Sequence, residues 1–560
     1  MATPQAVPPT VPADLAAPFD VLVVGAGING VGIAREAATR GLRVALLERD
    51  DIASGVSAWS GRLVHGGLRY LEHRDIALVR ESLRERERLF RLAPHLVEPI
   101  PVLMPFYATN RRPDWLIRLG MIAYDVLSWD KSTPRHRILS RTQVREQLPG
   151  LDPAGLRGAA RFYDGQVAYA ERLCVEVAVA ARQAGAVVRT RANVDEVLRA
   201  DGAVVGVAFT DTTTGARHEV RAPVVLNVTG PWIDRTFQHN FPPQPRMNGG
   251  TKGSHAIVDP FPGAPEEVVY YESKADGRLV LIIPWMGRYL IGCTDLRFDA
   301  DPGEARADHD EIAYLLGEVN TLIPEAQLTA EDVRYVYSGV RPLPYAPGVP
   351  ESKVPRSHVL HDHGAGLDGL YTVIGGKLTT FRQLAEDAVD TVFERLGRPP
   401  VPSATARLPL PGSHGGDPDA VQARLAALGG FSPAAVTRLV DLYGTRALEI
   451  WELAAADPTL HADLTAEAGA ATSVAGVTGA EIVYAVEHEF AVGLDDVFAR
   501  RTLLAFEPGH GLALVEAAAT VLTRRYGWDE ARRRAEIARY QDWLDHLALQ
   551  PALPDPGGAQ

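Results

Sequence analysis

The chain is poor in cysteine, carries an acidic net charge and lacks any long apolar run. Its two cysteines among 560 residues, Cys174 and Cys293, exclude a disulfide framework and any multi-cysteine metal or iron–sulfur site. They fit a reducing compartment. The net charge of −13 argues against nucleic acid as a partner, although an acidic total is compatible with a local basic pocket. No stretch approaches the roughly 20 apolar residues of a membrane-spanning helix, so we expect a cytoplasmic protein, or one that sits on a membrane without crossing it.

Changes in composition along the chain indicate how it is divided. Residues 1–18 are rich in Pro and Ala and lack a basic start or a long apolar core, which predicts a disordered lead-in and not a signal peptide. Strand signals dominate residues 240–340 and predict a mostly antiparallel sheet. A linker rich in Pro and Gly, 399–416, precedes a helical pattern over 417–548 and a loose tail at 549–560.

The most informative segment is near the start of the chain, where a buried strand at 21–24 leads through a glycine-rich turn into a helix. The turn glycines permit a tight bend, the approach of a pyrophosphate to the backbone, and close packing of helix on strand. They are Gly25, Gly27 and Gly30, and the helix that follows presents its N–H groups and positive dipole end to phosphates. A second strand ends in Glu48, where an acid accepts hydrogen bonds from a ribose. This segment predicts dinucleotide binding and leaves FAD and NAD both open.

Six further motifs follow in order and are more specific. They are GRLVHGGLRYLEH at 61–73, KGSH at 252–255, PW at 284–285, CTD at 293–295, SGVRP at 338–342 and GGKLTT at 375–380. With the opening segment, they show that residues 19 to about 395 resemble the FAD-dependent glycerol-3-phosphate dehydrogenases. The stretch from Glu487 to Thr502 resembles the C-terminal domain of the same family.

The resemblance implies an α/β fold with an FAD-binding Rossmann-type domain, an interleaved antiparallel-sheet substrate domain like that of D-amino-acid oxidases, and a C-terminal helical domain. On this chain, the FAD-binding domain is expected at 19–100, 155–235 and 335–396. The substrate domain is expected at 101–154 and 236–334, and the helical domain at 417–548.

The resemblance also implies an activity, the oxidation of sn-glycerol 3-phosphate to dihydroxyacetone phosphate. The hydride would pass from C2 to flavin N5, and the electrons then to a quinone. A glycerol-3-phosphate oxidase that uses O₂, and an amine or amino-acid oxidase on the same fold, are the alternatives. Oxidases resembling this family carry an extra insertion that this chain lacks, and an amino-acid oxidase has no use for several cations in its site.

The cofactor contacts follow from the glycine-rich segment together with the resemblance. The residues expected to contact FAD are Gly25, Gly27, Asn29, Gly30, Glu48, Arg62, His65, Gly66, Gly230, Gly376, Lys377, Leu378 and Thr379. Gly375 and Gly376 are expected to open a helix at Leu378, whose N–H groups and dipole would stabilise negative charge on the reduced flavin. No metal site is expected.

The catalytic candidates are His255 and Arg341. An imidazole titrates near neutrality and can take the hydroxyl proton of the substrate, although a lone histidine is more often structural. His65 is the rival base, but its neighbouring glycines favour contact with the flavin. The guanidinium of Arg341, in a turn that fixes its direction, can bind a phosphate through two hydrogen bonds, and a surface salt bridge is the plainer alternative.

The family pattern places further substrate contacts at Arg69, Tyr70, Thr294, Arg341 and Lys377. The chain departs from that pattern at two places. Gly61 and Arg62 stand where the family commonly has Ser and Lys, and Cys293 stands where it has Thr. The second departure puts in doubt a hydroxyl role at position 293 and leaves one for Thr294.

A basic amphipathic helix over residues 110–127 is the candidate membrane contact. It combines arginines with apolar residues in the way of helices that lie in a membrane interface, and a helix packed on the protein is the alternative. The residues concerned are Arg111, Arg112 and Arg118, with Trp115, Ile117, Met121 and Ile122. The resemblance implies a peripheral protein on the inner face of the plasma membrane, and the sequence leaves a homodimer open.

Overall fold

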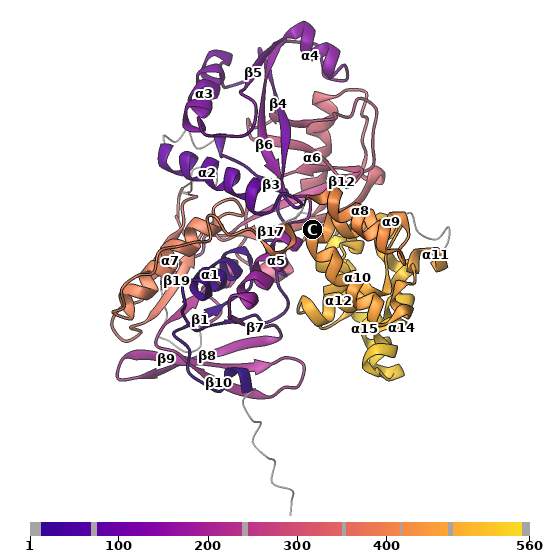
Figure 1. Ribbon diagram of the computed structural model, residues 1–560. Coiled ribbons are helices and arrows are strands. Elements are labelled where there is room, and N and C mark those ends of the chain that lie inside the picture. The colour runs from indigo at the N-terminus through magenta and orange to yellow at the C-terminus, as the bar shows by residue number, and fades with distance from the viewer. Residues whose placement is uncertain are drawn as a thin grey trace, which may run out of the picture.

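The computed structural model describes residues 13–68, 75–237, 245–349, 354, 356–414, 417–468 and 474–550. These residues form three parts that lie side by side: one built on a six-stranded sheet, one on a ten-stranded sheet, and a lobe of helices from the C-terminal part of the chain (Figure 1). No helix among the described residues is long and apolar enough to cross a membrane.

The six-stranded sheet has the order β18-β19-β11-β1-β2-β7 and is parallel except for its edge strand β18. Because side chains alternate along a strand, Val21 and Val23 of β1 face the core beneath the helices, while Leu22 and Val24 face the three-stranded sheet on the other side. The strands are β1 (Val21–Val24), β2 (Val44–Leu47), β7 (Val187–Arg189), β11 (Val225–Asn227), β18 (Val359–Asp362) and β19 (Leu370–Ile374).

Three helices cover one face of this sheet, and α1 packs against both of the others. They are α1 (Ile28–Thr39), α5 (Ala170–Gln183) and α7 (Phe381–Arg395). The small antiparallel sheet on the opposite face consists of β8 (Ala192–Ala200), β9 (Ala203–Asp211) and β10 (Arg217–Arg221). The central strand β1 is therefore buried on both faces, and its carboxyl end opens directly into the glycine turn.

The ten-stranded sheet is antiparallel apart from the pairing of β13 with β4. Its strands are β3 (Leu63–Val64), β4 (Glu98–Tyr107), β5 (Arg137–Ser140), β6 (Leu156–Gln166), β12 (Thr251–Val258), β13 (Val268–Glu272), β14 (Leu279–Trp285), β15 (Arg288–Gly292), β16 (Leu296–Arg297) and β17 (Val333–Arg341). The helices packed around it are α2 (Ile76–Leu92), α3 (Asp114–Leu127), α4 (Arg141–Gln147) and α6 (His309–Leu322).

The sheet membership of three strands differs from what the expected division of the chain implied. Strands β3, β6 and β17 fall in ranges assigned to the FAD-binding domain, yet each pairs within the ten-stranded sheet. Alternating apolar residues predict that a segment is a strand but do not specify which sheet it joins. The expected mostly antiparallel sheet over 240–340 is present.

The two ends of the chain also differ from expectation. Within the predicted lead-in 1–18, Ala13–Leu15 form a short helical turn, and Leu15 is buried against the core below the six-stranded sheet. A single leucine can anchor a segment whose composition otherwise predicts disorder. At the other end, Leu549 packs on the ten-stranded part and the Gln550 N–H donates to the Ala307 carbonyl, while residues 551–560 of the predicted tail lie outside the described residues.

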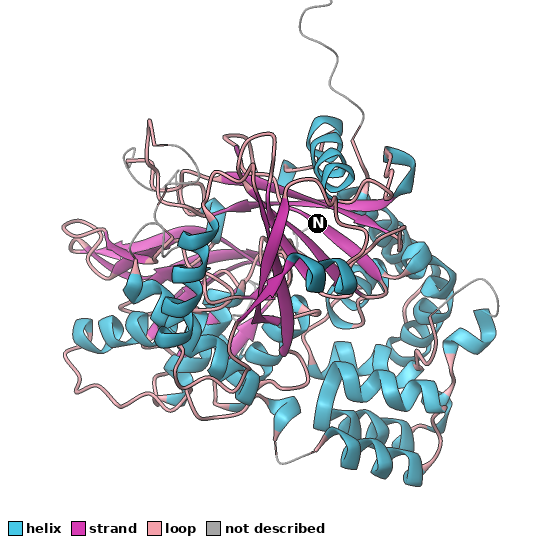
Figure 2. Ribbon diagram, turned by 90° about the horizontal axis from the view of Figure 1, so that it is seen from above, coloured by secondary structure: helices cyan, strands magenta, loops and turns pink. Residues whose placement is uncertain are grey.

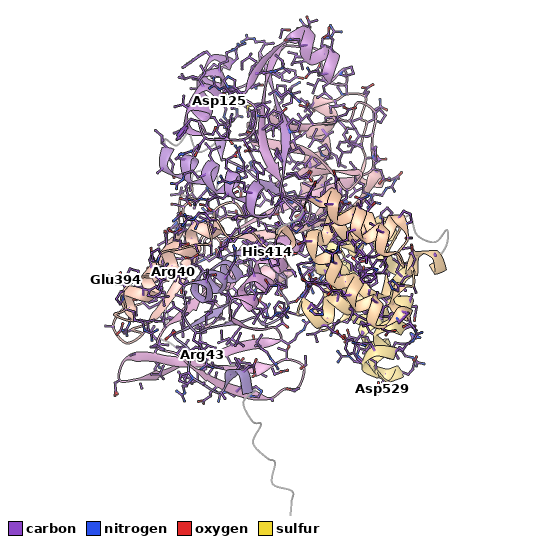
Figure 3. The ribbon with its side chains drawn as sticks, in the orientation of Figure 1. Arg40, Arg43, Asp125, Glu394, His414 and Asp529 are labelled. Atoms are coloured by element: carbon purple, nitrogen blue, oxygen red, sulfur yellow. The ribbon has the colours of Figure 1, made fainter. Side chains whose placement is uncertain are left out.

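The C-terminal lobe is a set of helices beside the two sheets (Figure 2). Its helices are α8 (Pro418–Leu428), α9 (Pro433–Tyr443), α10 (Ala447–Ala456), α11 (Leu464–Ala468), α12 (Gly479–His488), α13 (Leu494–Asp496), α14 (Leu512–Tyr526) and α15 (Glu530–Trp543), with a π-helix at Val497–Arg501. Local caps begin these helices, as when Asp529 accepts a hydrogen bond from the Arg532 backbone N–H. His414, in the linker, lies between the lobe and the sheets (Figure 3).

Candidate active site

A single cavity of about 860 Å³ brings together most of the residues that the sequence singled out. It extends from the glycine turn after β1 to the end of β17 and the turn after β19. Its lining includes twelve of the expected residues: Gly25, Gly27, Asn29, Glu48, His65, Gly230, His255, Arg341, Gly376, Lys377, Leu378 and Thr379. Segments far apart in the sequence therefore form one site.

The first turn of this cavity needs glycine for steric reasons. Gly25 has a φ of +103°, and a Cβ there would lie 2.7 Å from the Val228 carbonyl oxygen. A Cβ at Gly30 would lie 1.8 Å from the Gly25 carbonyl oxygen, because the helix crosses its own strand at close range. Gly27 is the N-cap of α1, so the helix presents its N-terminus to the cavity.

Glu48 directly follows β2 and lines the cavity. Its carboxylate accepts hydrogen bonds from the backbone N–H of Ala26 at 2.7 Å and of Asp50 at 2.9 Å. Burial raises the pKa of Glu48 to about 7, and those hydrogen bonds oppose the shift. The two carboxylate oxygens keep lone pairs for a ribose hydroxyl in this part of the site.

The second glycine turn, after β19, has φ values of +81° at Gly375 and +94° at Gly376. A Cβ at Gly376 would lie 2.4 Å from Nδ2 of Asn29, which donates a hydrogen bond to the Gly375 carbonyl at 3.3 Å. The two glycine turns are thus linked through the Asn29 side chain. The helix expected to start at Leu378 begins later, at Phe381, because Leu378–Thr380 form a turn.

His255 lies on β12 of the ten-stranded sheet, opposite Gly292 of β15 and Tyr337 of β17. A Cβ at Gly292 would lie 2.2 Å from the His255 Cδ2, so that glycine makes room for the ring. Burial, then the charges of Arg341 and Arg62, lower the pKa of His255 to about 3. Its Nδ1 has no hydrogen-bond partner among the described residues. The imidazole is therefore neutral at physiological pH and available to accept a proton.

Arg341 ends β17 with its guanidinium in the cavity wall. Its Nη1 donates to Asp295 at 2.9 Å, and its Nη2 donates to the Cys293 sulfur at 2.9 Å and to the Thr294 carbonyl at 3.2 Å. A Cβ at Gly253 would lie 2.1 Å from Nη2, so the glycine of the KGSH motif provides space for this side chain. The plainer alternative, an exposed surface salt bridge, does not fit this enclosed position.

The sequence analysis missed Arg356 and gave no role to Asp295 of the CTD motif. Arg356 lines the cavity, and its guanidinium lies 3.5 Å from the Asp295 carboxylate that also holds Arg341. Asp295 thus holds two arginines at one end of the site. Lys377 lies near them, and burial lowers its pKa to about 7, with Arg356 contributing to the shift. Arg356 belongs to no recognisable motif, so only the fold identifies it.

Four of the expected contacts do not line the cavity. Arg62 is fully buried and donates two hydrogen bonds to Glu171 of α5, one of them at 2.8 Å. Thr294 donates to Glu311 at 2.6 Å and accepts from the Ser254 N–H at 2.9 Å, so its hydroxyl serves the protein interior. The two glycines, Gly30 and Gly66, act through packing, since a Cβ at Gly66 would lie 2.2 Å from the Tyr124 hydroxyl.

These differences have a common cause: a motif specifies that a residue is present but not the direction of its side chain. Arg62 has a φ of +56°, a left-handed conformation that directs its side chain away from the cavity and onto α5. Arg69 and Tyr70, the remaining substrate candidates, lie outside the described residues. Their assignment stays a prediction.

The chemistry of the cavity suits FAD. A parallel sheet opens into a glycine turn at a helix N-terminus, an acid follows the second strand, and a second glycine turn, at Gly376, adjoins the first through Asn29. A Cβ at Gly376, or at Gly25, would fill the space that the backbone leaves open. The fold and the site together define an FAD-dependent oxidoreductase, with a nucleotide-binding part on the six-stranded sheet and a second part on the ten-stranded sheet.

The comparisons with known proteins agree with this class. Residues 20–382 match the family model described as FAD dependent oxidoreductase, and residues 403–533 match the model for the C-terminal domain of alpha-glycerophosphate oxidase. A glycerol-3-phosphate dehydrogenase from Synechocystis sp. is 41% identical over 96% of this chain and 97% of that protein. The aerobic glycerol-3-phosphate dehydrogenase from Bacillus subtilis is 30% identical over 95% and 96%.

Among solved structures, the glycerol-3-phosphate dehydrogenase from Bacillus halodurans complexed with FAD superposes with a TM-score of 0.78. It shares 26% sequence identity and covers 95% of this chain and 96% of that one. An L-alpha-glycerophosphate oxidase from Mycoplasma pneumoniae with FAD bound, at 18% identity and a TM-score of 0.55, covers 70% of this chain and shares the fold. The chain belongs to the FAD-dependent glycerol-3-phosphate dehydrogenase family.

Proposed function

We propose that this protein oxidises sn-glycerol 3-phosphate to dihydroxyacetone phosphate, with FAD as its cofactor and a quinone as electron acceptor. The observation that carries the proposal is that His255, Arg341, Arg356 and Lys377 line the same cavity as the glycine turns. A neutral base and three cationic side chains thus lie beside the expected cofactor site. Both named relatives that the chain matches over at least 95% of its length are glycerol-3-phosphate dehydrogenases.

The glycine turns, Glu48 and the N-terminus of α1 would hold FAD. When bound, FAD supplies the hydride acceptor for the C2 hydrogen of the substrate. The acid and the backbone N–H groups of the first turn suit the ribose and pyrophosphate. The second turn, with Gly376 and Thr379, also lines the cavity, and its backbone N–H groups would suit the flavin.

The phosphate of the substrate would bind at the arginine pair. Arg341 and Arg356 already share the Asp295 carboxylate, and Lys377 adds a third cation that is charged below about pH 7. Three cations and one carboxylate leave a net charge of +2, which matches a phosphate dianion. An amino-acid substrate would not use this excess of positive charge.

His255 would take the hydroxyl proton at C2. Its Nε2 lies beside the cavity wall, since a Cβ at Gly61 would lie 3.6 Å from it. Because the imidazole is neutral, it accepts a proton without first losing one. After burial, the charge of Arg341 contributes to the low pKa of His255, so a phosphate dianion bound to Arg341 would offset that charge and raise the basicity of the imidazole.

Purified protein, assayed with glycerol 3-phosphate, tests the function and the acceptor together. We expect rapid reduction of a dye or a quinone and little peroxide in air. Stoichiometric peroxide without quinone reduction would assign the protein as an oxidase. Turnover of amino acids in place of glycerol 3-phosphate would overturn the proposal.

Helix α3 supports the finer proposal that the protein binds a membrane surface. Its large apolar residues recur every three or four positions and are exposed, which is unusual on a protein surface in contact with water alone. The exposed fractions are 63% at Trp115, 55% at Leu119, 54% at Ile122, 65% at Val126 and 78% at Trp129 just beyond the helix. In Figure 1 this helix lies on the opposite side of the molecule from the helical lobe.

The structure changes which residues of this segment should contact lipid. Ile117, expected at the acyl boundary, packs against the core of the ten-stranded part. Arg112, expected at anionic lipid, donates to Glu272 at 2.7 Å. The exposed apolar residues of α3 are therefore a better choice than the arginines for testing membrane binding by substitution.

Changing Trp115 and Ile122 together to Gln should move the protein from sedimenting lipid vesicles to the supernatant, while dye-linked activity is retained. The matched control changes Val359 and Leu428 to Gln. Both are exposed apolar residues outside α3, at 46% and 41% exposure. This control should sediment like the wild type. Unchanged sedimentation of the α3 variant would place the membrane contact elsewhere.

A further inference from the structure

A network of buried ion pairs joins the helical lobe to the loop that follows β2. Asp51 of this loop is fully buried and receives two hydrogen bonds from Arg501, both at 2.7 Å, and a third from Nε of Arg500 at 2.5 Å. Both arginines belong to the π-helix Val497–Arg501, an irregular helix form that often marks a functional position. Two successive residues of the lobe thus hold one carboxylate.

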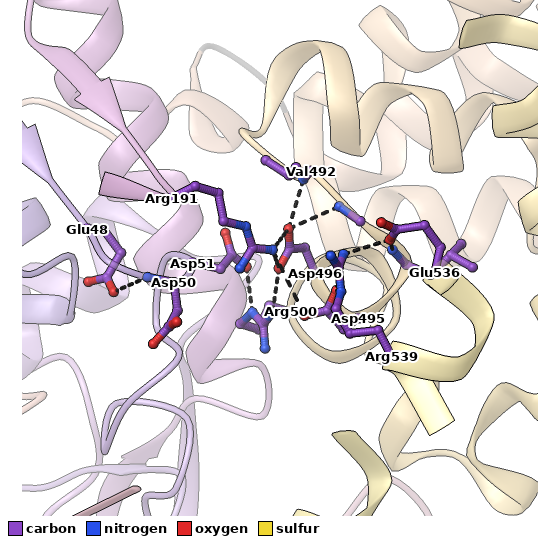
Figure 4. Close-up of polar contacts among 12 residues, drawn as sticks. Glu48, Asp50, Asp51, Arg191, Val492, Asp495, Asp496, Arg500, Glu536 and Arg539 are labelled. Carbon is purple, nitrogen blue, oxygen red and sulfur yellow. Dashed lines mark hydrogen bonds and ion pairs between the residues drawn. The ribbon is translucent and has the colours of Figure 1, made fainter. Parts of the chain in front are cut away.

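The same network reaches a second segment of the nucleotide-binding part (Figure 4). Arg500 donates to Asp496 at 2.6 Å, and Arg191, which follows β7, donates to the two oxygens of Asp496 at 2.7 and 2.6 Å. The backbone N–H groups of Val492 and Gly493 also donate to Asp496. The arginines hold the pKa of Asp496 below its usual range, so the network stays charged at physiological pH.

The network contacts two segments, the loop at Asp51 and the residue after β7, Arg191, and both lie next to Glu48. Asp50, next to Asp51, donates its N–H to the Glu48 carboxylate at 2.9 Å. Ala192, next to Arg191, donates its N–H to the Glu48 carbonyl at 2.7 Å, and the Arg191 N–H donates to the Asp50 carbonyl at 3.2 Å. The network therefore contacts the immediate neighbours of the acid at the ribose end of the cavity.

The backbone of both segments is in a conformation that needs outside support. Ala53 and Arg191 each have a φ of 60°, which residues with a Cβ rarely adopt. Such residues persist where surrounding contacts hold them. The loop from Glu48 to Gly61 supplies much of the cavity lining, including Ser57, whose hydroxyl accepts the Ile28 N–H at the start of α1.

We propose that the C-terminal helical lobe retains FAD: Arg500 and Arg501 fix Asp51, and with Asp496 and Arg191 they keep the Glu48 loop closed on the adenosine end of the cofactor. These are positioning residues, since none of them lines the cavity itself. The inference rests on FAD binding alone and is independent of the substrate and the electron acceptor.

The alternative is that the network only docks the lobe onto the rest of the protein. A second buried ion pair at the same junction separates these roles. Glu176 of α5 is fully buried and pairs with Arg446 of the lobe at 2.8 Å, but it lies on a helix and not on the Glu48 loop. Glu176→Gln therefore removes a comparable charge from the junction without touching the cofactor loop.

The experiment measures release of FAD from the full-length holoenzyme, by the rise in flavin fluorescence on dilution, for Asp51→Asn, Arg191→Gln and Glu176→Gln. We expect Asp51→Asn to release FAD at least about tenfold faster than wild type, as for loss of a hydrogen bond to a buried charge. Arg191→Gln should change the rate in the same direction by less, because its side chain is 13% exposed. Glu176→Gln should keep the wild-type rate.

The melting temperature of each apoprotein reports docking of the lobe. Glu176→Gln and Asp51→Asn should both lower the melting temperature, but only Asp51→Asn should speed the release of FAD. The two measurements thus distinguish cofactor retention from docking of the lobe. If Asp51→Asn does not fold, faster release from Arg191→Gln supports the proposal. Wild-type release from both Asp51→Asn and Arg191→Gln overturns it. Equally fast release from Glu176→Gln also overturns it, because retention would then follow from docking alone.

Discussion

The residues around Arg341 hold its guanidinium in one position, in the wall of the cavity. Gly253 makes room for Nη2, and Asp295 fixes Nη1. Arg341→Ala should weaken glycerol 3-phosphate binding by about 2–4 kcal/mol, because a phosphate loses a charge-assisted pair in an enclosed site. The measurement is the substrate KM, or the concentration dependence of flavin bleaching.

Arg334, also on β17, provides the matched control. It is half-exposed and pairs with Asp259 at the surface, so Arg334→Ala should leave the KM unchanged. A wild-type KM in Arg341→Ala would show that Arg341 does not bind the phosphate.

His255→Ala should slow reduction of the flavin by substrate by roughly 10²–10⁴-fold, the span expected for loss of a general base, with a much smaller effect on affinity. Stopped-flow absorbance measures it. Because burial and two arginines lower the pKa of His255 to about 3, the imidazole stays neutral from pH 8 to below 5. A fall in rate near pH 6 would belong to the substrate phosphate, whose second pKa is about 6. Unchanged reduction in the variant would give the role to His65 or to solvent.

Lys377 gives the site a pH dependence on the alkaline side. Burial lowers its pKa to about 7, so in the free enzyme it is charged below that pH and loses its charge as the pH rises through it. The substrate phosphate is already a dianion there, so kcat/KM should fall above about pH 7. Lys377→Arg keeps its charge and should remove this fall. A fall that persists in Lys377→Arg would come from another group.

At the scale of the element, the turn between β1 and α1 decides whether the cofactor binds. A Cβ at Gly27 would already lie 3.3 Å from the Ser57 hydroxyl, and a valine would extend into the space for the pyrophosphate. Gly27→Val should purify without FAD, as measured by the flavin-to-protein absorbance ratio. Gly317→Val in α6, where a Cβ meets no atom within 4 Å, should stay yellow. A yellow Gly27→Val protein would contradict the assignment of this turn.

Elements with a strong local pattern could be predicted from the sequence. The strands at 21–24, 44–47 and 370–374 are present as expected, because buried parallel strands read as short apolar runs. The start of α7 was placed at Leu378 but lies at Phe381, since the two glycines impose a turn before the helix. The pairing of β17 with β12 was not predictable, because it depends on contacts distant in sequence.

At the scale of the whole molecule, the motifs predicted which residues meet but not all of those that complete the site. His255, Arg341 and the glycines lie in motifs and line one cavity. Arg356 lies in no motif, and Arg62 turns away into the interior, so only the fold reveals their positions. The buried network between Asp51 and the helical lobe has the same origin, since its partners are about 450 residues apart.

The most direct test of the account is to mix the purified yellow protein with glycerol 3-phosphate without oxygen and to follow the flavin absorbance. We expect rapid, saturable bleaching with glycerol 3-phosphate and negligible bleaching with glycerol, because the cations of the cavity bind the phosphate and the neutral base takes the proton. No bleaching with glycerol 3-phosphate, or equal bleaching with glycerol, would contradict the proposed chemistry of this cavity.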